Sequence, residues 1–156
     1  MFVAGTDTSA ATLEWTMTEL AEHPELMKQA REEVRAVGRP TGKVVDKTHL
    51  QHLHFIKAAI EEAMRLHPSI PGLNLDLKDQ DFCFLPFGGG TCGSFGLASV
   101  EIALARLLFY FDWDLPHGFH IDDVNVDEIF SLATRKQPPL VLSQTVNGGL
   151  WGLLGQ

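Results

Sequence analysis

Cys92 lies in a glycine-rich stretch, residues 84–98, that follows a short apolar run and precedes a long apolar segment. Glycine backbone can approach a flat ligand closely because no Cβ holds the ligand away. A thiol at a helix N-terminus meets the positive end of the helix dipole, which favours the thiolate. The stretch therefore predicts a loop that offers a sulfur ligand to a large planar group. The alternative is a glycine-rich turn with a buried, inert cysteine.

An acid stands next to an alcohol near the N-terminus, in the sequence Ala-Gly-Thr-Asp-Thr-Ser at residues 4–9. Asp7 and Thr8 could deliver protons to a bound ligand, and Gly5 thins a helix beside them. The alternative is plain capping of a helix by these polar side chains, which the local sequence by itself favours.

Glu62 and Arg65 form a second pair, with the i, i+3 spacing that places two side chains on one helical face. The apolar neighbours Ile60 and Met64 favour a buried pair, although the spacing alone favours a surface pair. A zinc site at His49 and His52 is a weaker alternative, because no cysteine or carboxylate stands at a matching spacing. Solvated or core-edge histidines are expected instead.

Composition limits the classes of partner. Twelve basic against 20 acidic residues give a net charge of −8, which argues against nucleic acid or an anionic membrane surface. Two cysteines, Cys83 and Cys92, do not make a disulfide framework and are typical of a reducing compartment. The chain has no apolar run of about 18 residues, so no membrane span is expected.

The apolar periodicity predicts a mainly α fold that positions these residues. His23-Pro24 ends the first helix, because the residue before proline is pushed out of the helical region. Residues 72–81 are expected to be irregular, and residues 143–156 to form a disordered tail. Helices are expected over residues 6–22, 25–37, 50–67 and 95–111, and short strands near residues 111–115 and 139–142.

The order of the motifs resembles that of the cytochromes P450. An Ala-Gly-x-Asp-Thr-Ser helix is followed by Glu-x-x-Arg, and then by a Phe-x-x-Gly loop with a cysteine before an apolar helix. His23-Pro24, residues 111–113 and residues 128–136 are similar to plant-type microsomal members. The resemblance covers residues 1–142. It implies a partial cytochrome P450 fold, the C-terminal haem-binding region, with the long oxygen-activation helix, the Glu-x-x-Arg helix, and the Cys loop with its following helix.

The resemblance also implies roles for the first motif. Asp7 and Thr8 would be the catalytic acid and alcohol that manage protons for oxygen activation, and Ala4 and Gly5 would line the oxygen groove. The implied activity is a haem-dependent monooxygenase that inserts one oxygen of O2 into a small organic substrate, with electrons from an NADPH-dependent reductase. Members of this family lie at the endoplasmic reticulum membrane; without its anchor the chain would be cytoplasmic.

The resemblance implies roles for the other two motifs as well. Phe87 and Gly90 would belong to the loop beneath the haem, and Cys92 would be the axial ligand of the iron. In such sites the thiolate pushes electron density to the iron and favours O–O cleavage. Glu62 and Arg65 would form a buried pair in the core scaffold.

The chain departs from the family pattern Phe-x-x-Gly-x-Arg-x-Cys-x-Gly. Cys92 follows Phe87 two positions too early, and the arginine expected to pair with a haem propionate is absent, with Thr91 nearby. Several dozen residues that follow the Glu-x-x-Arg helix in the family are missing between Pro71 and Asn74. These departures indicate a C-terminal fragment with internal deletions, and they leave open the alternative of a catalytically inactive remnant that does not bind haem productively.

Overall fold

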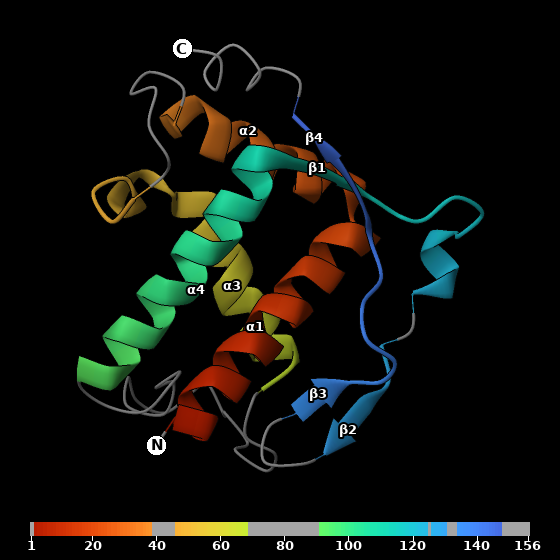
Figure 1. Cartoon of the computed structure of the whole chain (residues 1–156), viewed down its shortest axis with the longest axis horizontal. Helices are drawn as coiled ribbons and strands as arrows, with labels where there is room; N and C mark the ends of the chain where they lie inside the picture. The colour runs from red at the N-terminus through yellow and green to blue at the C-terminus, as the bar shows by residue number, and fades with distance from the viewer. Residues whose placement is uncertain (1, 39–45, 69–90, 125, 131–133, 148–156) are drawn as a thin grey trace.

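The computed structural model describes residues 2–38, 46–68, 91–124, 126–130 and 134–147. Four α-helices make up most of this part of the chain and pack around one apolar core, with two small sheets at its side (Figure 1). The helices are α1 (Phe2–Glu22), α2 (Pro24–Gly38), α3 (His54–Leu66) and α4 (Thr91–Tyr110). The prediction of a mainly α fold with short C-terminal strands is confirmed.

The helix ends follow local backbone chemistry. α1 ends at Glu22 and α2 begins at Pro24, as expected, because proline fits the first position of a helix. The single helix predicted over residues 50–67 is wrong: the short 3₁₀ turn η2 (Leu50–His52) is separated from α3 by Leu53, whose ψ of 72° is not helical. α4 begins at Thr91, four residues before the predicted start, so Cys92 lies in its first turn.

Two antiparallel sheets of two strands each lie beside the helices. β1 (Phe111–Asp114), predicted near residues 111–115, pairs with β4 (Ser143–Val146), with Phe111 opposite Val146. The strand expected near residues 139–142 therefore lies four residues later, within the segment expected to be a disordered tail. The second sheet pairs β2 (Glu128–Phe130) with β3 (Thr134–Lys136), and neither of these strands was expected.

The core forms where the apolar stripes of the four helices meet. On α3 the buried residues Ile56, Ile60, Ala63 and Met64 follow the i, i+4, i+7, i+8 spacing that places side chains on one helical face. Each large apolar side chain that is fully buried contributes about 1.5–3 kcal/mol relative to an exposed one. The largest fully buried apolar side chains are Trp15, Val34, Leu53, Ile56, Ile60, Leu104 and Leu108.

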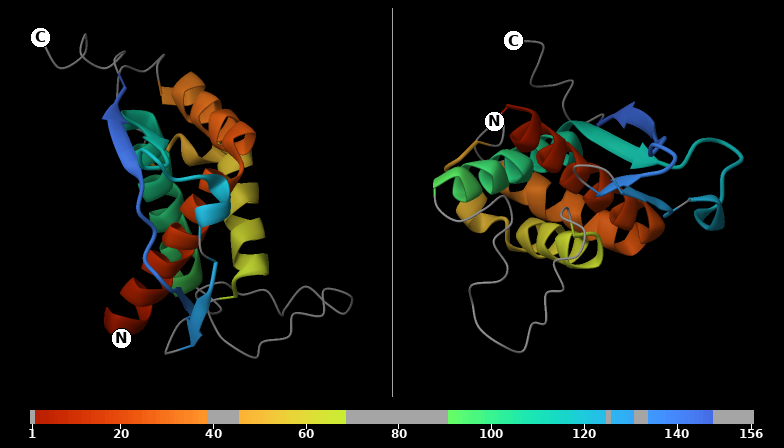
Figure 2. Two further views of the ribbon diagram at one scale, coloured as in Figure 1. Left: turned by 90° about the vertical axis from the view of Figure 1, so that its right-hand side faces the viewer. Right: turned by 90° about the horizontal axis from the view of Figure 1, so that it is seen from below.

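α1 and α4 lie side by side and begin at the same end of the molecule (Figures 1 and 2). On α1 the fully buried side chains begin at Ala11, and on α4 they begin at Val100, with Leu97 and Ala98 partly buried against the core. Before these positions Thr6 and Ser99 are exposed, and Asp7 and Thr8 are half-buried. Asp7 and Thr8 therefore lie on the part of α1 that precedes its fully buried residues.

None of the described helices is both long enough and apolar enough to span a membrane.

Candidate functional site

The acid–alcohol pair lies in the first half of α1. The Asp7 carboxylate forms an ion pair with Arg135 of β3, with Oδ2 and Nη2 2.7 Å apart. The Thr8 carbonyl accepts a hydrogen bond of 2.9 Å from the Thr12 hydroxyl. Ala4 and Gly5 lie on α1 one turn before Thr8, so all four predicted residues occupy neighbouring turns of one helix. No local sequence pattern predicts the Asp7–Arg135 pair, which joins residues far apart in the chain.

The predicted sulfur ligand lies at the start of α4. Cys92 is the second residue of this helix, so its thiol-bearing position is at the positive end of the helix dipole. Phe87 and Gly90, predicted to belong to the same loop, lie outside the described residues, as do Pro71 and Asn74, which border the expected deletion. The backbone therefore brings Cys92 to the same end of the helix pair as Asp7 and Thr8 (Figure 1).

The chemistry of this end fits a haem-thiolate group in part. A cysteine in the first turn of one helix and an acid–alcohol pair in the first half of its neighbour are the residue types that an iron ligand and a proton path require. The arginine that the family pattern places before the cysteine is absent from the sequence, where Thr91 stands nearby, and Arg135 is paired with Asp7.

Glu62 and Arg65 pair on the outer face of α3. Arg65 donates two hydrogen bonds of 2.7 Å, one from Nε and one from Nη2, to the two carboxylate oxygens. The burial implied by the family resemblance is wrong, and the surface pair that the spacing alone favours is found: 56% of the Glu62 side chain and 46% of the Arg65 side chain are exposed. The pairing lowers the pKa of Glu62 and raises that of Arg65. The pair lies outside because the opposite face of α3 carries the apolar stripe.

A second polar cluster, which the sequence did not predict, surrounds His67. Its Nδ1 lies 2.9 Å from Glu128 Oε1 of β2, and its Nε2 lies 2.8 Å from Glu19 Oε1 of α1. The imidazole stacks on the buried Trp15 ring, with centroids 3.7 Å apart and planes inclined by 7°. The Trp15 indole donates a hydrogen bond of 3.3 Å to the Thr134 carbonyl of β3. The cluster joins three segments, so no local pattern could have indicated it.

The remaining histidines confirm the core-edge interpretation at one position. His49 is 9% exposed, and its Nδ1 lies 2.9 Å from Asp46 Oδ1, whose pKa is lowered chiefly by hydrogen bonds from Thr48. Among the described residues, Glu19, Glu22 and His23 form one group that could hold a metal ion, because their ligand atoms lie within 4.8 Å of one another.

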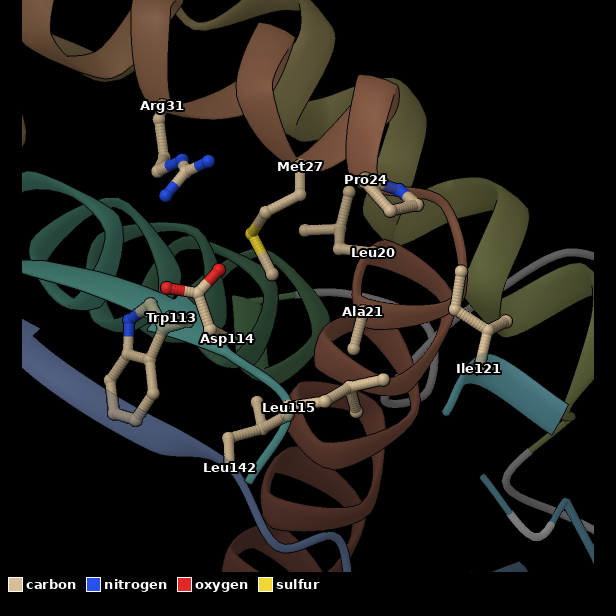
Figure 3. A pocket seen from close by; sticks show the side chains of 10 residues that line it. All are labelled: Leu20, Ala21, Pro24, Met27, Arg31, Trp113, Asp114, Leu115, Ile121 and Leu142. Carbon is tan, nitrogen blue, oxygen red and sulfur yellow. The ribbon is translucent and has the colours of Figure 1, made fainter. Parts of the chain in front are cut away.

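A small cavity of about 200 Å³ lies at the opposite end of α1 from Asp7 (Figure 3). Its wall is mostly apolar, from the end of α1, the start of α2 and the loop after β1, with Arg31 and Asp114 as charged members. Pockets for drug-sized ligands are usually about 300–1,000 Å³. Its size and place therefore separate this cavity from the helix end that carries Asp7 and Cys92.

Comparison with known proteins identifies the family to which the chain belongs. Residues 1–78 match the model of the family "Cytochrome P450", which is half of the chain. A crystal structure of a cytochrome P450 (CYP102L1) superimposes with a TM-score of 0.70 at 21% identity, over 92% of this chain and 43% of that one. The chain therefore belongs to the cytochrome P450 family, whose members hold a haem-thiolate cofactor.

Proteins similar in sequence to this chain include plant enzymes. Tryptamine 5-hydroxylase of Oryza sativa subsp. japonica is 39% identical over 201 positions, which cover 92% of this chain and 38% of that protein. Costunolide synthase of Lactuca sativa is 35% identical over 86% of this chain and 38% of that protein. These matches confirm the predicted resemblance to plant members. The chain spans less than two fifths of the length of either relative.

The alignment with the Oryza protein contains gaps in this chain. The match to the Oryza protein is 201 positions long, whereas 92% of 156 residues is about 144 residues, so about 57 positions hold no residue of this chain. This number agrees with the prediction that several dozen family residues are missing within the chain.

Proposed function

We propose that this chain forms the C-terminal haem-binding part of a cytochrome P450 monooxygenase, with Cys92 as the axial ligand of the iron. The observation that carries the proposal is that α1 and α4 begin at the same end of the molecule, so that Cys92 and the Asp7–Thr8 pair lie on neighbouring helices near that end. Haem, when bound there, supplies oxygen-activating chemistry, with the thiolate favouring O–O cleavage.

The residues of the chain have separate tasks in this proposal. The first turn of α4 holds the Cys92 thiolate, and the helix dipole stabilises its negative charge. The Thr8 hydroxyl holds a proton close to the ligand, and the Asp7 carboxylate replaces that proton from solvent. Ala4 and Gly5 leave space beside them because they carry little or no side chain. Phe87 and Gly90 complete the loop before Cys92.

Arg135 controls the availability of Asp7 in this scheme. Its guanidinium occupies one carboxylate oxygen of Asp7 at 2.7 Å, and its own side chain is half exposed. The exposed position lets the arginine move aside while the carboxylate takes a proton. Electrons come from an NADPH-dependent reductase, the substrate is a small organic molecule, and the setting is the endoplasmic reticulum membrane, as for the family.

Titration of the purified chain with hemin tests the proposal. We expect saturable binding with a Soret band that Cys92→Ala removes and Cys83→Ala retains, because only Cys92 lies at the start of α4. Equal binding by both variants and the parent chain would contradict the assignment of Cys92.

A second candidate is a remnant that does not bind haem productively. Two observations favour it: the Glu62–Arg65 pair is exposed instead of buried, and about 57 aligned positions of a 201-position match are empty. The missing propionate arginine would weaken anchoring, because hydrogen bonds to charged groups are worth about 1.5–3 kcal/mol each. The hemin titration separates the two candidates, since the remnant would give no saturable Soret band.

A further inference from the structure

We propose that the cavity between the end of α1 and the start of α2 is a binding site for a small α-amino acid with an apolar side chain. The cavity is completed by β1 and the loop that follows it (Figure 3). The described residues that line it include none of those assigned to the proposed haem site. Binding of an amino acid here is therefore independent of haem binding.

The interior of the cavity suits one apolar side chain. Leu20 and Met27, which are 2% and 3% exposed, form part of the wall, and Leu115 and Leu142 lie beside them. The volume of the cavity is about 200 Å³. Because a cavity of about 150 Å³ lined by leucine, isoleucine and phenylalanine holds benzene, this space admits a side chain the size of leucine or phenylalanine.

The edge of the cavity carries one positive and one negative side chain. Figure 3 shows the guanidinium of Arg31 and the carboxylate of Asp114 turned toward each other. They do not pair with each other, since Arg31 binds Asp112 at 3.1 Å. Among the residues that the structure describes, the Asp114 carboxylate, which is exposed, has no hydrogen-bond partner. Both groups are thus available to a ligand.

The protein balances these two charges incompletely. Arg31 and Arg35 share the carboxylate of Asp112, at 3.1 and 2.9 Å, so two guanidinium groups face one carboxylate. These three side chains retain one positive charge, and Asp114 supplies a negative charge beside them. A zwitterion matches this arrangement, because its carboxylate accepts from Arg31 while its ammonium donates to Asp114. An α-amino acid carries both groups on the carbon that bears its side chain.

Contacts outside the cavity hold its walls in place. Asp112 joins β1 to α2 through both arginines, which fixes the position of Arg31. The indole of Trp113 donates a hydrogen bond of 3.1 Å to the Leu107 carbonyl of α4, which fixes the neighbouring wall. Side chains that are ordered before the ligand arrives lose less conformational freedom on binding, so this arrangement favours affinity.

Titration of the purified chain with L-phenylalanine, followed by NMR, tests the proposal. The probe is the indole N–H of Trp113, because this residue lines the cavity and the phenyl ring of the ligand would shift its signal. We expect saturable shifts with a Kd on the order of 1 mM for so small a ligand. Phenethylamine, which lacks the carboxylate, and 3-phenylpropionate, which lacks the ammonium, should each bind about tenfold more weakly.

Two charge variants assign the head groups. Asp114→Asn should weaken L-phenylalanine about tenfold and should not weaken 3-phenylpropionate, which has no ammonium for this carboxylate. Arg31→Gln should weaken L-phenylalanine and should not weaken phenethylamine, which has no carboxylate. Asp112 keeps Arg35 as a partner in the second variant, so the link between α2 and β1 remains.

A third variant fills the cavity. Ala21→Leu places a larger side chain in the wall and should abolish the shifts, whereas Ala36→Leu, the same change at an exposed position of α2, should leave them intact. The proposal is overturned if L-phenylalanine gives no saturable shifts, if all three compounds bind equally, or if Asp114→Asn weakens 3-phenylpropionate as much as L-phenylalanine. Every measurement uses the chain without haem, so its outcome is separate from that of the hemin titration.

Discussion

Glu101 is a carboxylate that α4 buries in the core. It is 6% exposed, and this burial is the main cause of its raised pKa, with a further rise from Glu61 and an opposing effect of Lys57. A raised pKa means that the folded state resists ionisation of the group. The folded state is therefore penalised above the unfolded pKa of about 4.3, and the penalty disappears as the pH falls below that value.

We predict that Glu101→Gln raises the unfolding midpoint at pH 7, because the amide carries no charge to desolvate. The gain should shrink toward zero at about pH 4, where the parent carboxyl is protonated in both states. Urea unfolding at several pH values measures this difference. Glu32→Gln, at an exposed position of α2, is the control and should show no such trend. A gain that persists unchanged at acid pH would refute the burial argument.

At the residue scale, the sequence predicted contacts within one helix better than contacts between distant segments. The i, i+3 spacing brought Glu62 to Arg65 correctly, because that contact is local to one helix. The spacing alone also favoured their exposure, whereas the burial that the family resemblance implied depends on contacts beyond this helix. The partner of Asp7 and the stacking of His67 on Trp15 depend on strands whose docking no local pattern encodes.

α2 and α4 approach closely where α2 ends. A Cβ placed on Gly38 would lie 2.5 Å from Cε2 of the buried Phe109 ring. Helix propensity alone would make alanine better than glycine here by about 1 kcal/mol. We predict the reverse: Gly38→Ala should lower the free energy of unfolding by about 1–3 kcal/mol, because the ring has to move.

A double-mutant cycle isolates this contact. Phe109→Leu shortens the side chain that blocks the new methyl group, so the combined variant should lose less stability than the sum of the single losses. Strictly additive losses, or a more stable Gly38→Ala, would show that the two helices are not as close as described.

Asp112 links α2 to β1. Its Oδ1 accepts from Arg31 at 3.1 Å and from Arg35 at 2.9 Å, and the three side chains are 16–32% exposed. We predict that Asp112→Asn costs roughly 1–2 kcal/mol, between the values for exposed and buried ion pairs. Chemical denaturation measures the loss, and Asp114→Asn, an exposed change on the same strand, is the control. Equal effects of both substitutions would contradict a specific link.

At the element scale the helices were predictable and the strands mostly were not. The apolar stripes and the His23-Pro24 junction located all four helices to within a few residues, apart from the break at Leu53. β2 and β3 are three residues each, too short for alternation to show in the sequence. Their places depend on contacts with α1 and the end of α3.

The described part of the molecule combines a packed helical core with exposed apolar side chains at its periphery. Among them are Leu26 of α2 and Leu66 of α3, each 43% exposed, and Val141 in the segment before β4, which is 66% exposed. The family relatives are more than twice as long, and about 57 positions within the aligned span have no counterpart here. The fold class followed from the order of the sequence motifs.

The reduced carbonyl spectrum of the hemin-loaded chain tests most directly whether Cys92 ligates haem iron. Thiolate ligation shifts the Soret band of the carbonyl complex to a longer wavelength than ligation by histidine or a neutral thiol. We predict this shifted band for the parent chain and for Cys83→Ala, and its loss in Cys92→Ala. A parent chain whose spectrum lacks the shifted band, or a Cys92→Ala variant that retains it, would contradict the account.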